Sequence, residues 1–210
     1  MRAVRWFIVV VILACVCWLF PLFHVVTLKT ATAEKAAATF NATQFAETFW
    51  TNQLPSALEK TVAAKMLLPA IQSDAAAAKK KFARSLGLGE GYFYFLRGAG
   101  KIISVSDDEI ILTVTENSTN AEVSLQTGLI FGNALRDGTG LLNASDYPNS
   151  QDFNDISAAL NHLVETRVLP KLREQAKVGA KISFVGCAEV DDESTDLKPL
   201  KVMPIQTEVQ

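Results

Sequence analysis

Apolar and polar positions divide the chain into three parts. Trp6 to Val26 carries no side chain with a fixed charge over about twenty residues, and a helix of that length crosses a bilayer. After it, apolar residues recur at helical spacing as far as about residue 89, and from Tyr92 they alternate with polar ones. The pattern predicts an α+β chain with an N-terminal membrane helix, a small helical subdomain and a strand-rich subdomain. The expected divisions are residues 1–30, 31–89 and 90–210.

The helical part carries start and stop signals. Asn41 is a suitable N-cap with Gln44 three residues later, and Ser56 begins the same spacing for a second helix that Pro69 is expected to end. A third helix is expected from about Asp74 onward. These signals predict three short helices.

The strand-rich part combines six alternating runs with one helix. Four runs come first, YFYFLRG, KIISVS, EIILTVT and AEVSLQTG, and the glycines between the first two are interpreted as a turn. A helix capped by Asp152 and bent or ended near Pro170 follows, and then two closing strands, AKISFVGCAEV and LKPLKVMPIQTEV. Strands, an interposed helix and further strands are the order of an OB-like barrel.

Two features around the apolar segment leave its processing open. Arg2 and Arg5 precede it, so it is expected to span the membrane once, with the rest of the chain outside the cytoplasm. Cys15 ends a lipobox-like run and is a candidate for lipidation, while Ala31-Thr32-Ala33 is an acceptable signal-peptide cleavage site. An uncleaved span is the preferred interpretation.

Charge and residue types narrow the function. The chain carries 20 basic and 22 acidic residues, and without Arg2 and Arg5 the outer part has a net charge of about −4. Such a charge lacks the electrostatic footprint of nucleic-acid binding. The sequence contains no HExxH, CxxC, GxSxG or phosphate-loop motif, and Cys187 is expected to pack as a small apolar residue. We therefore expect no catalytic activity, no metal and no cofactor.

One polar set stands out around the glycine-rich segment and the helix after it. Its members are Arg136, Asp137, Tyr147, Asn149 and Asn161. They are candidates for binding a ligand or partner, and the alternative is that they satisfy backbone groups of an irregular connection, with an internal Arg/Asp pair. If the segment is extended, Arg136 and Asp137 point to opposite faces and each must find its own partner.

Several short motifs resemble one family. Phe40-Asn41-Ala42, GKIISV, QTGLIFGNALRD, DYPNS with ISAALN, and KISFVGCAEV occur in the order found in the predicted periplasmic lipoproteins called domain of unknown function 2291. The resemblance covers nearly the whole chain from Phe40 to Val209. It implies a helical subdomain followed by an OB-like one, an envelope location, and genes that often lie beside sugar ABC-transporter components. Together with the predicted span, this places the expected location at the inner membrane, with the C-terminal part in the periplasm.

Three hypotheses about function follow. The preferred one is a non-enzymatic, membrane-tethered envelope protein that binds or supports a component of a sugar ABC transporter. The second is a stand-alone module for a small ligand or sugar, with Tyr92, Tyr94 and Tyr147 as stacking residues, and the third is an uncharacterised hydrolase.

The interpretation of the N-terminal segment predicts a charge-dependent topology. Replacing Arg2 and Arg5 by Glu is expected to weaken or invert insertion, because these residues supply the positive charge immediately before the apolar run. A reporter fused after Gln210 measures the orientation, and a reporter that stays fully outside the cytoplasm would contradict it. The mass of the mature protein separates an intact Met1 from a lipid on Cys15.

Overall fold

The computed structural model describes Trp6 and residues 40–210 with the exception of 86–90, 117 and 148. The chain divides into two compact units, Met1–Phe40 and Asn41–Gln210. Within the described residues, no helix has both the length and the apolar character needed to cross a bilayer. The predicted membrane segment, Trp6 apart, lies outside the described residues, as does Cys15, and both interpretations stay predictions. The boundary expected near residue 89, between the helical and the strand-rich subdomains, also stays a prediction.

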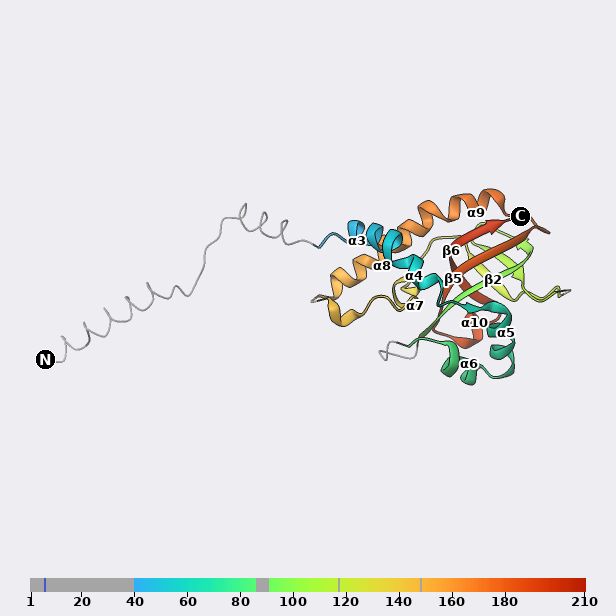
Figure 1. Ribbon diagram of the computed structural model, residues 1–210, viewed down its shortest axis with the longest axis horizontal. Coiled ribbons are helices and arrows are strands. Elements are labelled where there is room, and N and C mark those ends of the chain that lie inside the picture. The colour runs from blue at the N-terminus through green and yellow to red at the C-terminus, as the bar shows by residue number, and fades with distance from the viewer. Residues whose placement is uncertain (1–5, 7–39, 86–90, 117, 148) are drawn as a thin grey trace. The chain divides into compact units, whose positions relative to one another are not determined.

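The second unit is built on one closed sheet (Figure 1). Its strands are β1 (Val62–Ala63), β2 (Tyr92–Val105), β3 (Glu109–Thr113), β4 (Val123–Gln126), β5 (Lys181–Val190) and β6 (Leu200–Val209). The order is β1-β2-β3-β4-β6-β5, and β2 also pairs with β5, which closes the barrel. Strands β4 and β6 are parallel, whereas β2, β3 and β5 have antiparallel partners along the barrel. The helix between the third and fourth barrel strands, β4 and β5, confirms the expected OB-like arrangement.

Strand β2 corrects one prediction. The runs YFYFLRG and KIISVS were expected to be separate strands with a turn at Gly98 and Gly100, but they form one strand of 14 residues. A Cβ at Gly98 would lie 2.8 Å from Phe184 Cζ and 2.9 Å from Ala64 Cβ, and a Cβ at Gly100 would meet the carbonyl of Thr113. These glycines therefore do not form a turn. They continue the strand and allow neighbouring segments to approach it closely.

The first and the last of the helices before the barrel begin where the sequence predicts. They are α3 (Ala42–Thr48), the π-helix η1 (Phe49–Gln53), α4 (Leu54–Leu58), α5 (Ala64–Ser73) and α6 (Ala75–Phe82). Asn41 caps α3 by accepting from the amide of Gln44 at 2.9 Å, and Asp74 caps α6 by accepting from Ala77 at 2.9 Å. Both predicted starts are confirmed.

The predicted second helix is wrong at both ends. Ser56 lies inside α4 and donates its hydroxyl to the carbonyl of Gln53 at 2.7 Å, so it caps nothing. Pro69 lies inside α5 and does not end it. The missing N–H of an exposed proline removes a single helical hydrogen bond, while Leu67, Leu68 and Ile71 of the same helix are buried. Burial of an apolar side chain contributes about 1.5–3 kcal/mol, which offsets that loss.

The segment between β4 and β5 is mostly helical. Its elements are α7 (Ala134–Gly138), the 3₁₀ turn η2 (Ala144–Asp146), α8 (Ser150–Arg167) and α9 (Leu169–Gln175), and α10 (Glu193–Asp196) follows β5. The N-cap of α8 is Asn149, three residues before the expected Asp152, because the Asn149 side chain accepts from the Asp152 amide at 2.8 Å. The break near Pro170 is confirmed by the junction of α8 and α9. Figure 1 shows α8 and α9 on one side of the barrel and α5 and α6 on the other.

The core lies inside the barrel and beneath these helices. Tyr92 and Tyr94, proposed above as stacking residues, are buried and pack edge to face with ring centroids 5.4 Å apart. Tyr92 donates to Glu193 at 2.9 Å, and the Tyr94 hydroxyl has no hydrogen-bond partner among the described residues. Neither ring is exposed to a ligand, so this part of the stacking hypothesis is wrong.

A buried carboxylate joins the ends of β3 and β4. Glu122 accepts hydrogen bonds from the amides of Val114 and Thr115, at 2.6 and 2.8 Å, and from the hydroxyls of Thr113 and Thr115, at 3.2 and 2.6 Å. Burial opposes ionisation, but these donors outweigh it and lower the pKa of Glu122 below its ordinary value. Ionised Glu122 thus stabilises the folded chain.

Glu122→Gln is expected to lower the free energy of unfolding by about 2–3 kcal/mol near neutral pH, because several hydrogen bonds to a charged group are weakened or lost. Since the folded pKa lies below the unfolded one, this contribution is complete above the unfolded pKa and disappears as the pH falls through the folded pKa. Chemical denaturation from pH 7 down to pH ~3 measures the difference. Glu116→Gln is the control, because Glu116 forms an exposed ion pair with Lys65, and it should change the free energy of unfolding little. If the difference between wild type and Glu122→Gln did not shrink in acid, ionised Glu122 would not be the source of the stability.

Candidate functional site

The segment between β4 and α8 holds most of the polar set that the sequence singled out. Helix α7 lies in its middle, and all five of its residues are buried. Arg136 and Asp137 are 6 % and 1 % exposed. Helix α7 is therefore an interior element whose polar groups need partners within the protein.

Arg136 and Asp137 pair with each other. Arg136 Nε lies 2.7 Å from Asp137 Oδ1, and Nη2 lies 2.8 Å from Oδ2. The prediction that adjacent residues would find separate partners is wrong, because it assumed an extended chain, and in helix α7 neighbouring side chains diverge by only about 100°. Arg136 also donates from Nη1 to the carbonyl of Phe153 at 3.2 Å, and its guanidinium stacks 3.8 Å from the Phe153 ring centroid.

Further contacts tie the segment to α8 and β5. Asn161 donates to the carbonyl of Gly132 at 3.1 Å, and the Asn133 amide donates to Glu189 at 2.9 Å. Burial raises the pKa of Glu189, the amide of Asn133 opposes that shift, and the nearby Asp191 and Asp137 add to it. Gly132 adopts φ 81°, a conformation that favours glycine.

The remaining two candidates lie at the start of α8. Asn149 is exposed and serves as the N-cap of that helix. Tyr147 is half-buried; its ring packs edge to face on Phe45, at 6.1 Å, and tilted on Phe153, at 5.1 Å. The structure thus gives each of the five residues a contact that supports the fold. Their role in binding a ligand stays a prediction.

A separate groove of about 890 Å³ lies on the outer side of the barrel. Its walls come from η1 and α4, the start of α5, strands β2, β5 and β6, and the junction of α8 and α9. Apolar side chains line it from the helices and from the sheet. They include Trp50, Leu54, Leu58, Phe184, Val185 and Ile205.

Polar side chains line the same groove. They are Lys65, Arg97, Arg167, Lys171, Ser183, Gln206, Thr207 and Glu208. Arg167 forms an ion pair with Glu47 of α3, in which Nη2 lies 2.6 Å from each carboxylate oxygen. A surface that combines apolar walls with a few convergent polar groups is typical of small-molecule sites.

Gly98 shapes the wall of this groove. It lies on β2 between Arg97 and Ala99, and all three residues line the groove. Because glycine lacks a Cβ, Phe184 of β5 and Ala64 at the start of α5 can both contact the strand there. The glycine is thus needed where helix and sheet meet.

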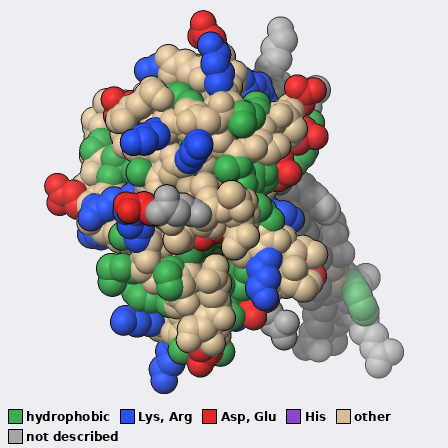
Figure 2. Space-filling model, turned by 90° about the vertical axis from the view of Figure 1, so that its right-hand side faces the viewer, with side chains coloured by type: hydrophobic (Ala, Val, Ile, Leu, Met, Phe, Trp, Pro, Cys, Tyr) green, Lys and Arg blue, Asp and Glu red, His purple; other side chains and the backbone are tan. Residues whose placement is uncertain are grey.

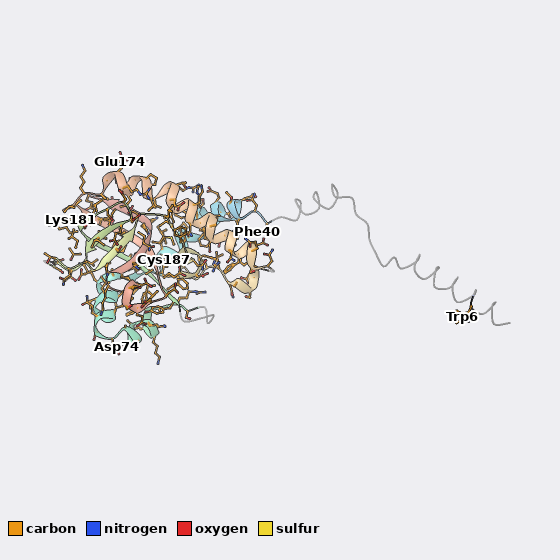
Figure 3. The ribbon with its side chains drawn as sticks, turned by 180° about the vertical axis from the view of Figure 1, so that it is seen from behind. Trp6, Phe40, Asp74, Glu174, Lys181 and Cys187 are labelled. Carbon is orange, nitrogen blue, oxygen red and sulfur yellow. The ribbon has the colours of Figure 1, made fainter. Side chains whose placement is uncertain are left out.

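The described residues offer little for covalent or metal chemistry. No three His, Cys, Asp or Glu side chains among them are placed to hold a metal ion. Cys187 is fully buried, and burial raises the pKa of its thiol. It lies in the interior, between the sides of the molecule that carry Asp74 and Glu174 (Figure 3). The expectation that Cys187 packs as an apolar residue is confirmed.

The groove was not anticipated from the sequence. Its residues come from six separate stretches between Trp50 and Glu208, and no motif connects them. Arg97 is the one local indication of the groove, because it is a charged residue directly after five buried positions of a strand.

Comparisons with known proteins bear on both fold and family. The family model described as predicted periplasmic lipoprotein (DUF2291) matches residues 7–208. The chain is similar to the crystal structure of an OB-fold protein from Thermotoga maritima MSB8, with a TM-score of 0.71 and 25% identity over 82% of this chain and 99% of that one. None of the curated proteins matches the chain.

The buried ion pair of α7 gives a stability prediction. Arg136→Ala and Asp137→Ala should each lower the free energy of unfolding by about 3–5 kcal/mol, because each leaves the other charge buried without its partner. The double variant Arg136→Met/Asp137→Leu should cost much less than the sum. Chemical denaturation measures all three.

Arg97→Ala is the matched control, since that arginine is exposed and forms no ion pair with another described residue. It should leave stability nearly unchanged. Additive single effects in the double variant would show that Arg136 and Asp137 do not act as a pair.

Proposed function

The chain belongs to the DUF2291 family of predicted periplasmic lipoproteins, and from this premise we propose that it is a non-catalytic binding component of the cell envelope. In this proposal the unit Asn41–Gln210 lies on the periplasmic side of the inner membrane, tethered by the N-terminal segment as a single span or through lipidated Cys15. The unit holds a small ligand in the groove beside β2. Family membership supports the envelope location.

The groove is the observation that carries the proposal. Its volume of about 890 Å³ lies within the range of ordinary small-molecule sites, roughly 300–1,000 Å³. Its lining comes mainly from regular elements: the strands β2, β5 and β6 and the helices η1, α4, α5, α8 and α9. Such walls are rigid enough to present a defined set of contacts.

The kind of ligand follows from fold and charge together. OB folds bind oligonucleotides and oligosaccharides. The net charge of the chain is −2, and acidic and basic side chains are interspersed on the face drawn in Figure 2, so that face offers a nucleic acid no extended basic surface. A sugar or sugar derivative is the ligand we prefer.

The family that the chain resembles suggests a partner, because its genes often lie beside those of sugar ABC transporters. We propose that the loaded unit supports such an importer as an accessory component. The stand-alone binding module is the alternative, and it differs in having no transporter partner.

The proposal predicts that a bulky side chain in the groove abolishes binding. Ala99 is exposed on β2 and lines the groove, so Ala99→Phe should fill the space with little effect on the core. A panel of sugars and sugar acids is tested by thermal unfolding of the full-length protein in detergent. A ligand at about 100 times its Kd stabilises by roughly 2.7 kcal/mol, and the variant should lose this stabilisation.

Ala121→Phe is the control, because Ala121 is exposed before β4 and does not line the groove. Capture of importer subunits from membranes by wild type separates the accessory component from the stand-alone module. If no compound of the panel stabilises the protein and no importer subunit is captured, the proposal fails.

A further inference from the structure

The groove has the opposite charge balance to the chain as a whole. Among the described residues that line it, Lys65, Arg97, Arg167 and Lys171 are basic and Glu208 is the single acidic one. The whole chain, by contrast, carries more acidic than basic residues. The groove is therefore a local positive region on an acidic protein.

Two of these cations lie beside a carboxylate and two do not. Arg167 is paired with Glu47, and Lys65 lies 3.6 Å from Glu116. Within the described part of the chain, neither Arg97 nor Lys171 lies within 4.0 Å of a carboxylate. Arg97 lies on β2 and Lys171 on α9, so the two available cations come from different elements that line the groove.

Other features of the groove suit an anion with an apolar body. Trp50 of η1, Leu58 of α4 and Val185 of β5 are partly exposed and supply apolar surface, whereas Phe184, Leu54 and Ile205 beneath them are buried. Helix α5 begins in the wall at Ala64, and its N-cap residue, Ala63, provides no side-chain bond to the first amides. These amides add positive potential to that of the basic side chains, which are the main contribution.

We propose that the groove binds a small organic anion, whose carboxylate or phosphate is held by Arg97 and Lys171 and whose apolar face packs against Trp50. This inference rests on the proposed function, since it assigns the ligand class of the same groove. Arg97 provides a planar fork of donors that matches either head group, and Lys171 adds a second charge.

A matched pair of fluorescent probes tests the charge requirement. Anilinonaphthalene sulfonate is an anion, and N-phenylnaphthylamine has the same aromatic body without the sulfonate. With the full-length protein in detergent, the anionic probe should bind at least about tenfold more tightly than the neutral one, which corresponds to one good charged contact. Its affinity should fall as salt is raised, because exposed charges are screened.

Variants locate the contact. Arg97→Gln and Lys171→Gln should each weaken binding of the anionic probe by about tenfold and leave the neutral probe unchanged. Lys101→Gln on the same strand and Lys177→Gln just after α9 are the controls, since both lysines are exposed and lie outside the groove. Thermal unfolding of all four variants confirms that they are folded.

Competition identifies the head group. Displacement of the probe by glucuronate assigns a carboxylate, and displacement by glucose phosphate assigns a phosphate. Equal displacement by neutral glucose would overturn the proposal, as would equal affinities of the two probes or an anionic probe indifferent to Arg97 and Lys171. If both probes bind equally and Ala99→Phe blocks both, the groove binds ligands but has no preference for anions, and only the present inference fails. If neither probe binds, the proposal that the groove is a binding site fails too.

Discussion

Pairing of β2 with both β5 and β3 is the constraint on which the rest of the structure depends. Ten residues of β2, Tyr92 to Lys101, pair with β5, and the strand then continues along β3 from Lys101 to Val105. One continuous strand thus belongs to two parts of the barrel wall and closes it. Closure removes exposed sheet edges and encloses the core. Because neighbouring segments approach β2 closely at Gly98 and Gly100, a side chain larger than hydrogen cannot be accommodated there without displacement of Phe184, Ala64 or Thr113.

The same strand explains where the groove lies. Beside Gly98, the start of α5 contacts the outer face of the sheet, and the helices η1 and α4 form the opposite wall. The Arg167–Glu47 ion pair joins the end of α8 to α3, so the two helical segments are linked across the chain. Both charges are about half exposed, and this pair contributes positioning more than stability. The groove is therefore a consequence of how the helices cover a closed barrel.

Fold and site are separate matters in this protein. In OB folds the strand 2–3 face and the adjoining loops commonly receive ligands, and the equivalent strands here are β3 and β4. The groove instead uses β2, β5 and β6, so the location of a site in other OB folds does not predict it. The buried polar segment around α7, which looks like a site in the sequence, is internally satisfied by Asp137, Asn161 and Glu189.

The sequence alone determined the α+β class, the OB-like order of strands and helix, the cap at Asn41, the helix start near Asp74 and the family, because hydrophobic period, capping and motif order are local properties. It failed where tertiary packing outweighed local preference: Pro69 is retained inside a helix by its buried neighbours, and Gly98 and Gly100 continue a strand because of what lies across from them. The expectation of separate partners for Arg136 and Asp137 assumed an extended chain and was wrong, whereas the alternative interpretation, an internal pair, is what the helix forms. Only the tertiary structure assembled the groove, because its walls come from segments about 150 residues apart, and no local pattern records which segments meet.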